Sequence, residues 1–166
     1  MCAAGNNAKA VAAQAVLLTA LGNSSPVKFY TAPTGVIGKA VGSTCSVSAF
    51  QAVHSDSGLA GVYLVSDADK VAKSVSAVVA ALKSFKANDI EGVKKQAHNN
   101  ALRAKAHTDV YSLERTAQLL ISQDNYISQI PNVSAGDVEA AAQKLVKKLS
   151  IASYGNINDV PYADTL

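Results

Sequence analysis

The chain has 166 residues, of which 49% are hydrophobic and 16% are charged. This balance is typical of one globular domain with a single core and excludes a disordered chain. The net charge is only +3, and the basic residues are scattered rather than gathered in a patch, so nucleic-acid binding is not expected. No apolar run reaches membrane-spanning length, and two cysteines do not make a disulfide framework.

The first predicted element is a helix from about Asn7 to Ala20. Its residues are apolar nearly all round, which is usual for a buried helix. Gly22 is a stop signal just after it. Residues 23–35 are predicted to form a loop, and a short helical piece is predicted over Val36–Ala40.

Two strands are predicted next, over residues 44–53 and 58–66. In both, side chains of low polarity alternate with period two, as expected of strands covered on both faces. The segment between them, residues 54–57, has strong turn chemistry. A β-hairpin is therefore predicted.

Helices follow the hairpin, and three of them have capping signatures at their starts, at residues 66–69, 88–91 and 134–137. A further helix is predicted over about Val110–Ser122. The apolar residues after each signature recur at helical spacing, which predicts that one side of each helix is buried.

A last strand is predicted over residues 150–156, where it would join the same sheet, and the tail 157–166 is expected on the surface. The order of elements is helix, hairpin, four helices and strand. It indicates an α+β fold with a mainly antiparallel sheet and helices packed on one face.

The turn contains residue types that serve as nucleophile, base and acid: His54, Ser55, Asp56 and Ser57. Catalytic triads, however, are assembled from separate parts of a fold, and neighbouring residues on a strand point to opposite sides. The favoured interpretation is structural: Asp56 and Ser57 bond to turn amides ahead of Gly58.

Other chemical motifs are also missing from the sequence. His98 and His107 are nine residues apart, which is not a spacing that places two ligands on one helix face, and no H-E-x-x-H or H-x-x-E-H is present. The segment 35-GVIGK-39 is too short for a phosphate-binding loop and precedes strands. We therefore predict no catalytic residue, no cofactor site and no metal site.

Several blocks of the sequence resemble a known family in order along the chain. They are 46-SVSAFQAVHSDSG-58, 55-SDSGLAGVY-63, 137-DVEAAAQKLV-146 and 150-SIASYGNINDVPYADTL-166. They are similar to the C-terminal domain of the family of mitochondrial processing peptidase-like proteins, which includes pitrilysin-type zinc peptidases and the core proteins of ubiquinol–cytochrome c reductase (respiratory complex III). V-S-A-F, S-D-S-G-L and the tail favour the core protein 2 type over the peptidase subunits.

The resemblance implies a single peptidase-like domain over residues 1–166 and a non-catalytic structural role on the matrix side of the mitochondrial inner membrane. The implied partners are other subunits of complex III, including core protein 1. The alternatives are the substrate-handling domain of a mitochondrial processing peptidase subunit and a stand-alone binding module.

Relative to the family pattern, the domain is expected to lack its leading strands at the N-terminus. Strands without their neighbours expose backbone donors and acceptors along a sheet edge. The chain is therefore expected to self-associate through such an edge.

Overall fold

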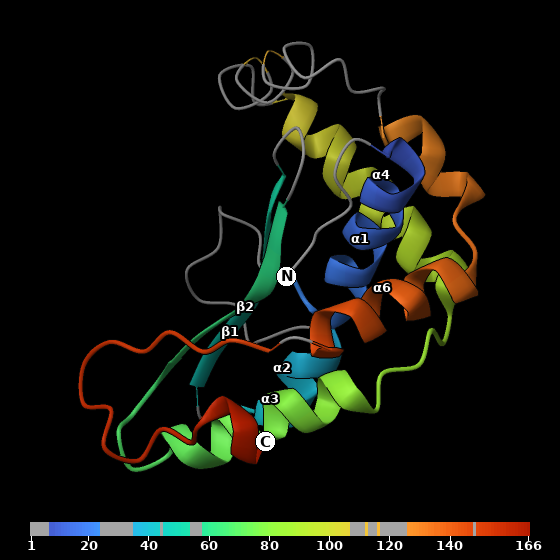
Figure 1. Ribbon diagram of the computed structural model, residues 1–166. Helices are drawn as coiled ribbons and strands as arrows, with labels where there is room; N and C mark the ends of the chain where they lie inside the picture. The colour runs from blue at the N-terminus through green and yellow to red at the C-terminus, as the bar shows by residue number, and fades with distance from the viewer. Residues whose placement is uncertain are drawn as a thin grey trace.

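The structure is a computed structural model that describes residues 7–23, 35–43, 45–53, 58–106, 112, 116, 126–147 and 149–166. Its helices and strands, labelled as in Figure 1, are α1 (Ala8–Leu21), α2 (Gly35–Val41), β1 (Cys45–Val53), β2 (Gly58–Ser66), α3 (Val71–Lys83), α4 (Ile90–Ala106), η1 (Tyr126–Asn132), α6 (Ala135–Lys147) and η2 (Ala163–Thr165).

Helix α1 lies at the centre of the core, as its sequence predicts. The Asn7 side chain begins the helix by accepting hydrogen bonds from the main-chain N–H groups of Lys9 and Ala10, at 3.1 and 3.2 Å. Gly22 ends it with a φ of 118°. Between these ends the helix packs against α2, β1, α4, η1 and α6, which explains why it is apolar on most sides.

The start of α2 lies close to the end of α1, and a glycine makes this approach possible. Gly35 has a φ of +75°, and a Cβ at this position would overlap the Leu21 carbonyl. Both the backbone conformation and the lack of space therefore require glycine. The predicted short helix over 36–40 is confirmed, extended by one residue at each end.

The predicted hairpin is also confirmed: β1 and β2 pair in antiparallel register from Cys45 opposite Ser66 to Val53 opposite Gly58. Only one face of it is covered, however. The face that includes Val47, Ala49 and Ala60 is buried in the core, whereas the opposite face is largely exposed. The expectation of two covered faces is therefore wrong, because the described helices lie on one side of the sheet (Figure 1).

The three capping signatures have different outcomes. The box before α6 forms as predicted: Ser134 and Asp137 bond to each other's main-chain N–H groups at 3.2 and 3.0 Å. Before α4, Asp89 supplies the cap by accepting from the Gly92 N–H at 3.3 Å.

The box at 66–69 does not form, and this prediction is wrong. Helix α3 begins at Val71 after a turn, and its N-cap residue, Lys70, makes no side-chain capping bond. The Lys70 amine instead lies 2.8 Å from the Asp67 carboxylate, and this hydrogen bond lowers the pKa of Asp67. Asp67, which is not the acid of the predicted box, therefore stabilises the turn, and the predicted acid, Asp69, precedes the helix.

The last predicted strand is wrong as well. Residues 149–162 contain no strand, and among the described residues the sheet consists of β1 and β2 alone. Residues 152–156 are all exposed, so this segment packs no face against the core. The tail ends in η2, and the Lys83 amine donates to the Leu166 main-chain oxygen at 2.6 Å.

The fold is thus α+β, with helices on one face of an antiparallel hairpin, as predicted at that level. The turn at 54–57 and nearly all of the helix predicted over 110–122 lie outside the described residues. Within the second, only Ser112 and Thr116 are described; both are helical, and the Thr116 hydroxyl donates to the Ser112 carbonyl at 2.7 Å.

Candidate interaction surface

The residues that carry chemistry do not gather into a site in the described part of the chain. His54, Ser55, Asp56, Ser57 and His107 lie outside it, and His98 is half-buried on α4. Cys45 is a free thiol in the core at the start of β1. The described residues contain no group of three His, Cys, Asp or Glu that could hold a metal ion. None of the described helices combines the length and hydropathy that a membrane crossing needs.

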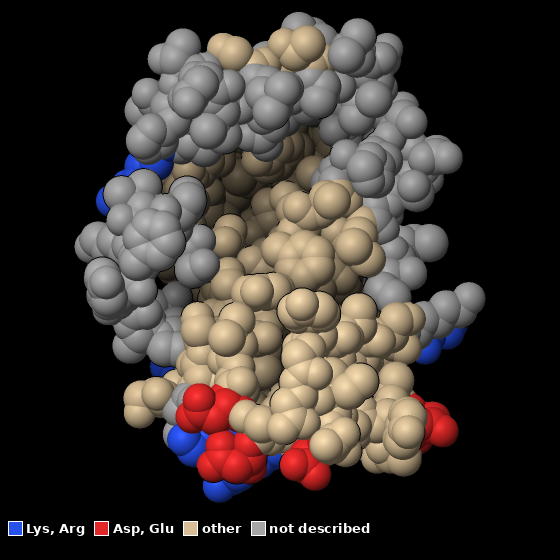
Figure 2. Space-filling model, turned by 90° about the vertical axis from the view of Figure 1, so that its left-hand side faces the viewer, with Lys and Arg blue, Asp and Glu red and all other residues tan. Residues whose placement is uncertain are grey.

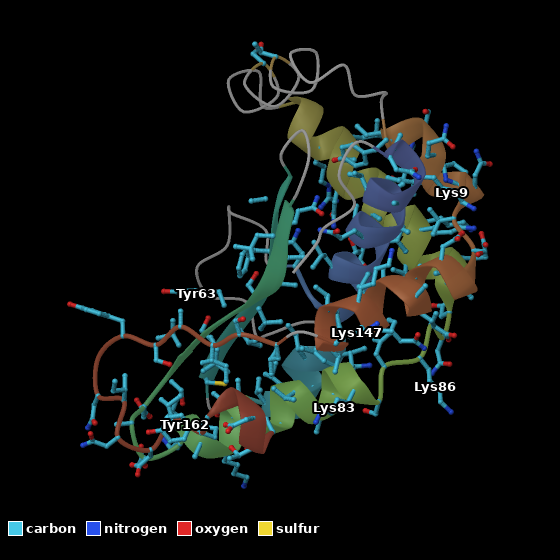
Figure 3. The ribbon with its side chains drawn as sticks, in the orientation of Figure 1. Lys9, Tyr63, Lys83, Lys86, Lys147 and Tyr162 are labelled. Atoms are coloured by element: carbon cyan, nitrogen blue, oxygen red, sulfur yellow. The ribbon has the colours of Figure 1, made fainter. Side chains whose placement is uncertain are left out.

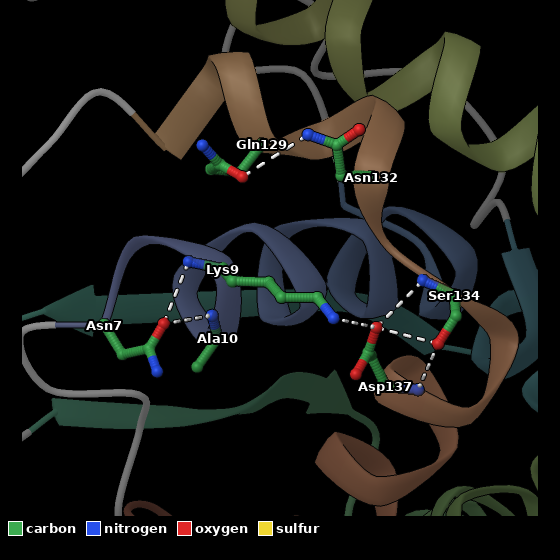
Figure 4. A network of polar contacts seen from close by, with 7 residues as sticks. All are labelled: Asn7, Lys9, Ala10, Gln129, Asn132, Ser134 and Asp137. Carbon is green, nitrogen blue, oxygen red and sulfur yellow. Dashed lines mark hydrogen bonds and ion pairs between the residues drawn. The ribbon is translucent and has the colours of Figure 1, made fainter.

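A polar network between α1 and α6 borders a cavity of about 210 Å³ (Figure 4). The Lys9 amine lies 3.1 Å from the Asp137 carboxylate, which also accepts from the Ser134 main-chain N–H and hydroxyl. These three donors, with the Ser134 main-chain N–H first, lower the pKa of Asp137 from 3.8 to about 2.

The network is explained by helix structure. Asn7 caps α1, Asp137 and Ser134 cap α6, and Lys9 joins the starts of the two helices by an ion pair. A carboxylate kept ionised by such partners does not supply a proton near neutral pH. The network therefore stabilises the packing of α1 on α6.

The uncovered face of the hairpin is apolar. Four large side chains on it are exposed by 40–65%: Phe50, Leu59, Tyr63 and Val65. The strand register brings them onto one face. Phe50 lies opposite Gly61. The residues two positions before and after Phe50 on the same face, Ser48 and Ala52, lie opposite Tyr63 and Leu59. We call these four residues the open sheet face.

The figures show the surroundings of this face. Figure 2 views the molecule from this side and shows uncharged residues across its middle, with the acidic side chains that are visible gathered at its lower end. In Figure 3 the Tyr63 side chain points away from the helices. Exposed apolar patches of this kind, bordered by polar residues, mark interaction sites more often than isolated apolar residues do.

A glycine shapes the middle of the open sheet face. A Cβ at Gly61 would lie 3.2 Å from two atoms of the Phe50 ring, so the ring lies directly against the bare backbone of β2. An aromatic ring placed across a strand glycine shields the backbone and fixes the register. The patch therefore has a defined shape.

The hairpin is also fixed to the helices behind it. The Gln14 amide of α1 donates to the Gln51 side chain of β1 at 3.2 Å, and the Ala49 main-chain N–H donates to the Gly22 carbonyl at 3.0 Å. Both bonds join α1 or its C-cap to β1. These bonds hold the hairpin, and with it the open sheet face, against α1.

The sequence contained only part of the signal for this surface. Period-two spacing identifies which side chains share a face, and it does so correctly for both strands. Both faces of β2 are apolar in the sequence, so its spacing cannot tell which one the helices cover. In β1, Ser46 and Ser48 are the polar residues that mark the uncovered face.

Comparison with known proteins gives a consistent relationship over most of the chain. No protein-family model matches it. Mitochondrial cytochrome b-c1 complex subunit 2 of Mus musculus is 31% identical over 131 residues, which are 72% of this chain and 29% of the relative. The Homo sapiens subunit 2 is 30% identical over 141 residues, or 78% of this chain and 31% of the relative. The Rattus norvegicus subunit 2 is 31% identical over 131 residues. The chain therefore spans less than a third of the length of these relatives.

Proposed function

The chain is homologous to one part of mitochondrial cytochrome b-c1 complex subunit 2, the core protein 2 of respiratory complex III, and from this relationship we propose that it is a non-catalytic structural domain of that complex. The proposed role is to hold neighbouring subunits together on the matrix side of the inner membrane. Core protein 1 is a proposed partner.

The observation that carries this proposal is the open sheet face. A domain that acts by assembly needs a surface that a partner covers, and four large apolar side chains lie together on the one face that the described helices leave bare. Non-catalytic character is supported by the polar network of Figure 4, in which the charged groups serve as helix caps and ion pairs.

We further propose that the chain forms one peptidase-like domain. In support, the resemblance covers most of the chain, and the order of a long buried helix, a hairpin and later helices is that of an α+β domain with helices on one side of a sheet. Residues 149–162, where the family pattern has its closing strand, form no strand.

Incorporation into the complex is the direct test. An epitope-tagged chain would be expressed in mitochondria, and mild-detergent extracts would be separated on a native gel. We expect the tag to migrate with cytochrome b-c1 complex subunits. A tag found only at the position of the free chain would contradict the proposal.

The proposed lack of catalysis is tested separately. The purified chain, with and without added zinc, is expected to leave presequence peptides intact over hours. Cleavage that depends on zinc and is lost in His54→Ala would instead favour the processing-peptidase alternative. The curated relatives give no support to that alternative, because the names of all three describe a cytochrome b-c1 complex subunit.

We also propose that the isolated chain self-associates through the outer edge of β2. On β1, the Ala49 N–H is already bonded to Gly22, whereas β2 pairs with β1 alone among the described residues. Unpaired strand edges promote pairing with another copy. Light scattering at about micromolar concentration should detect a dimer or larger species; a strictly monomeric folded chain would exclude this edge as an interface.

A further inference from the structure

A concave surface lies between the C-terminal ends of α3 and α6, away from the open sheet face. It is a groove of about 460 Å³. Its apolar lining includes Leu82, Phe85 and Val146; Leu82 is buried, and the other two are half-buried. The groove thus has an apolar floor with room for a side chain of another molecule.

Three lysines stand around this floor. Lys83 comes from the end of α3, Lys86 from the residues just after it, and Lys147 from the end of α6 (Figure 3). All three are exposed. Segments far apart in the sequence therefore bring their positive charges to one groove.

Few of these charges are balanced nearby. The acidic residue in the lining is Glu139, and its carboxylate already accepts from the Ala87 main-chain N–H at 3.2 Å. Lys83 donates to the main-chain oxygen of Leu166. Lys86 and Lys147 have no ion-pair partner among the described residues. The rim is therefore net positive.

We propose that the α3–α6 groove docks an acidic, amphipathic segment of a partner protein. An apolar side chain of that segment lies on the floor at Phe85 and Val146, and its flanking carboxylates pair with Lys86 and Lys147. Charge complementarity decides the class of partner. A small anion would leave the apolar floor unused, and a flat bilayer surface would not reach into a concave groove.

The probe for this proposal is a fluorescently labelled peptide that contains Glu and Leu in an amphipathic pattern. Fluorescence anisotropy with the full chain should give saturable binding. The affinity should fall steeply as ionic strength rises from about 0.01 M to about 0.15 M, because exposed charge pairs are screened by salt. A peptide with Gln in place of every Glu should bind at least about tenfold more weakly.

The double variant Lys86→Glu with Lys147→Glu should also weaken binding by about tenfold or more. The matched control is Lys73→Glu with Lys95→Glu, which changes the net charge equally at exposed positions that do not line the groove. The control should bind within about twofold of the unaltered chain. Thermal melting checks folding, and Lys86→Ala with Lys147→Ala replaces the reversed pair if that pair unfolds.

Equal weakening by the two double variants would overturn the proposal, because it would indicate attraction by overall charge. Equal affinity for the Gln peptide, or no binding of the Glu–Leu peptide, would overturn it too. Binding to vesicles of anionic lipid without binding to the peptide would assign the lysines to a membrane surface instead. The assay uses the chain alone, so its outcome is independent of whether the chain enters the cytochrome b-c1 complex.

Discussion

Asp137 is a surface carboxylate whose charge state is coupled to folding. Its pKa is about 2 in the folded chain, against an ordinary value of 3.8, because Ser134 and Lys9 donate hydrogen bonds to it. A pKa that is lower in the folded state stabilises the fold above the ordinary pKa, and this contribution is lost as the pH falls toward the folded value.

We expect Asp137→Asn to reduce the free energy of unfolding by about 0.3–1 kcal/mol at neutral pH, the usual contribution of a negative charge near a helix N-terminus. The difference from the unaltered chain should shrink as the pH falls from about 4 to about 2. Urea unfolding at several pH values measures it. Asp159→Asn, at an exposed tail position, is the control and should change little; a pH-independent difference for Asp137→Asn would refute the electrostatic explanation.

Two glycines with a left-handed backbone allow the cost of backbone strain to be measured apart from the cost of steric overlap. Gly35 has a φ of +75° and Gly42 a φ of +65°, but only at Gly35 would a Cβ meet other atoms, those of Leu21 and Gly22. Gly42→Ala should therefore cost about 1–2 kcal/mol from backbone strain alone. Gly35→Ala should cost clearly more, and equal costs by chemical denaturation would show that the close approach of α1 and α2 does not matter.

At the scale of elements, the side chains of α1 and of the open sheet face differ in how much they contribute to the stability of the fold. Leu17 of α1 is fully buried, whereas Leu59 of β2 is 44% exposed. The same substitution should therefore have different effects: Leu17→Ala should cost about 2–5 kcal/mol, as in other cores, and Leu59→Ala well under that. Thermal unfolding of both variants checks this, and similar losses would mean that the sheet face is part of the core.

The helices also show which features could be predicted from residues that are neighbours in the sequence. The cap of α6 was predicted because Ser134 stands directly before an apolar repeat and its bond spans three residues. The Asn7 cap of α1 is equally local but was not predicted. The cap predicted at 66–69 was wrong because α3 begins only at Val71, so Ser66 and Asp69 do not stand at its start. A capping pattern thus predicts a cap correctly where the helix begins directly after its first residue, as α6 does after Ser134.

Features that depend on contacts between distant segments could not be predicted from the sequence, for a different reason. A strand at 150–156 needs a partner far along the chain, and its composition alone does not supply one. Which face of the hairpin is bare depends on where the helices pack. The α3–α6 groove depends on the same packing, because Lys83 and Lys86 are more than sixty residues from Lys147. The absence of a catalytic site was predicted from missing motifs and stays a prediction.

At the scale of the whole molecule, the arrangement is one-sided. Helices cover one face of the hairpin, and the other face presents Phe50, Leu59, Tyr63 and Val65. We propose that other subunits of the cytochrome b-c1 complex cover this face, which would remove apolar surface from water on assembly.

Photo-crosslinking tests this claim most directly. Tyr63 would be replaced by benzoylphenylalanine in the tagged chain, and the control would carry the same replacement at Lys73, an exposed position on α3. Native complexes from mitochondria would be irradiated and adducts identified by mass spectrometry. We predict adducts between position 63 and other cytochrome b-c1 complex subunits, and few from position 73. A position 63 that gives no adduct, in a chain that migrates with the complex, would contradict the claim.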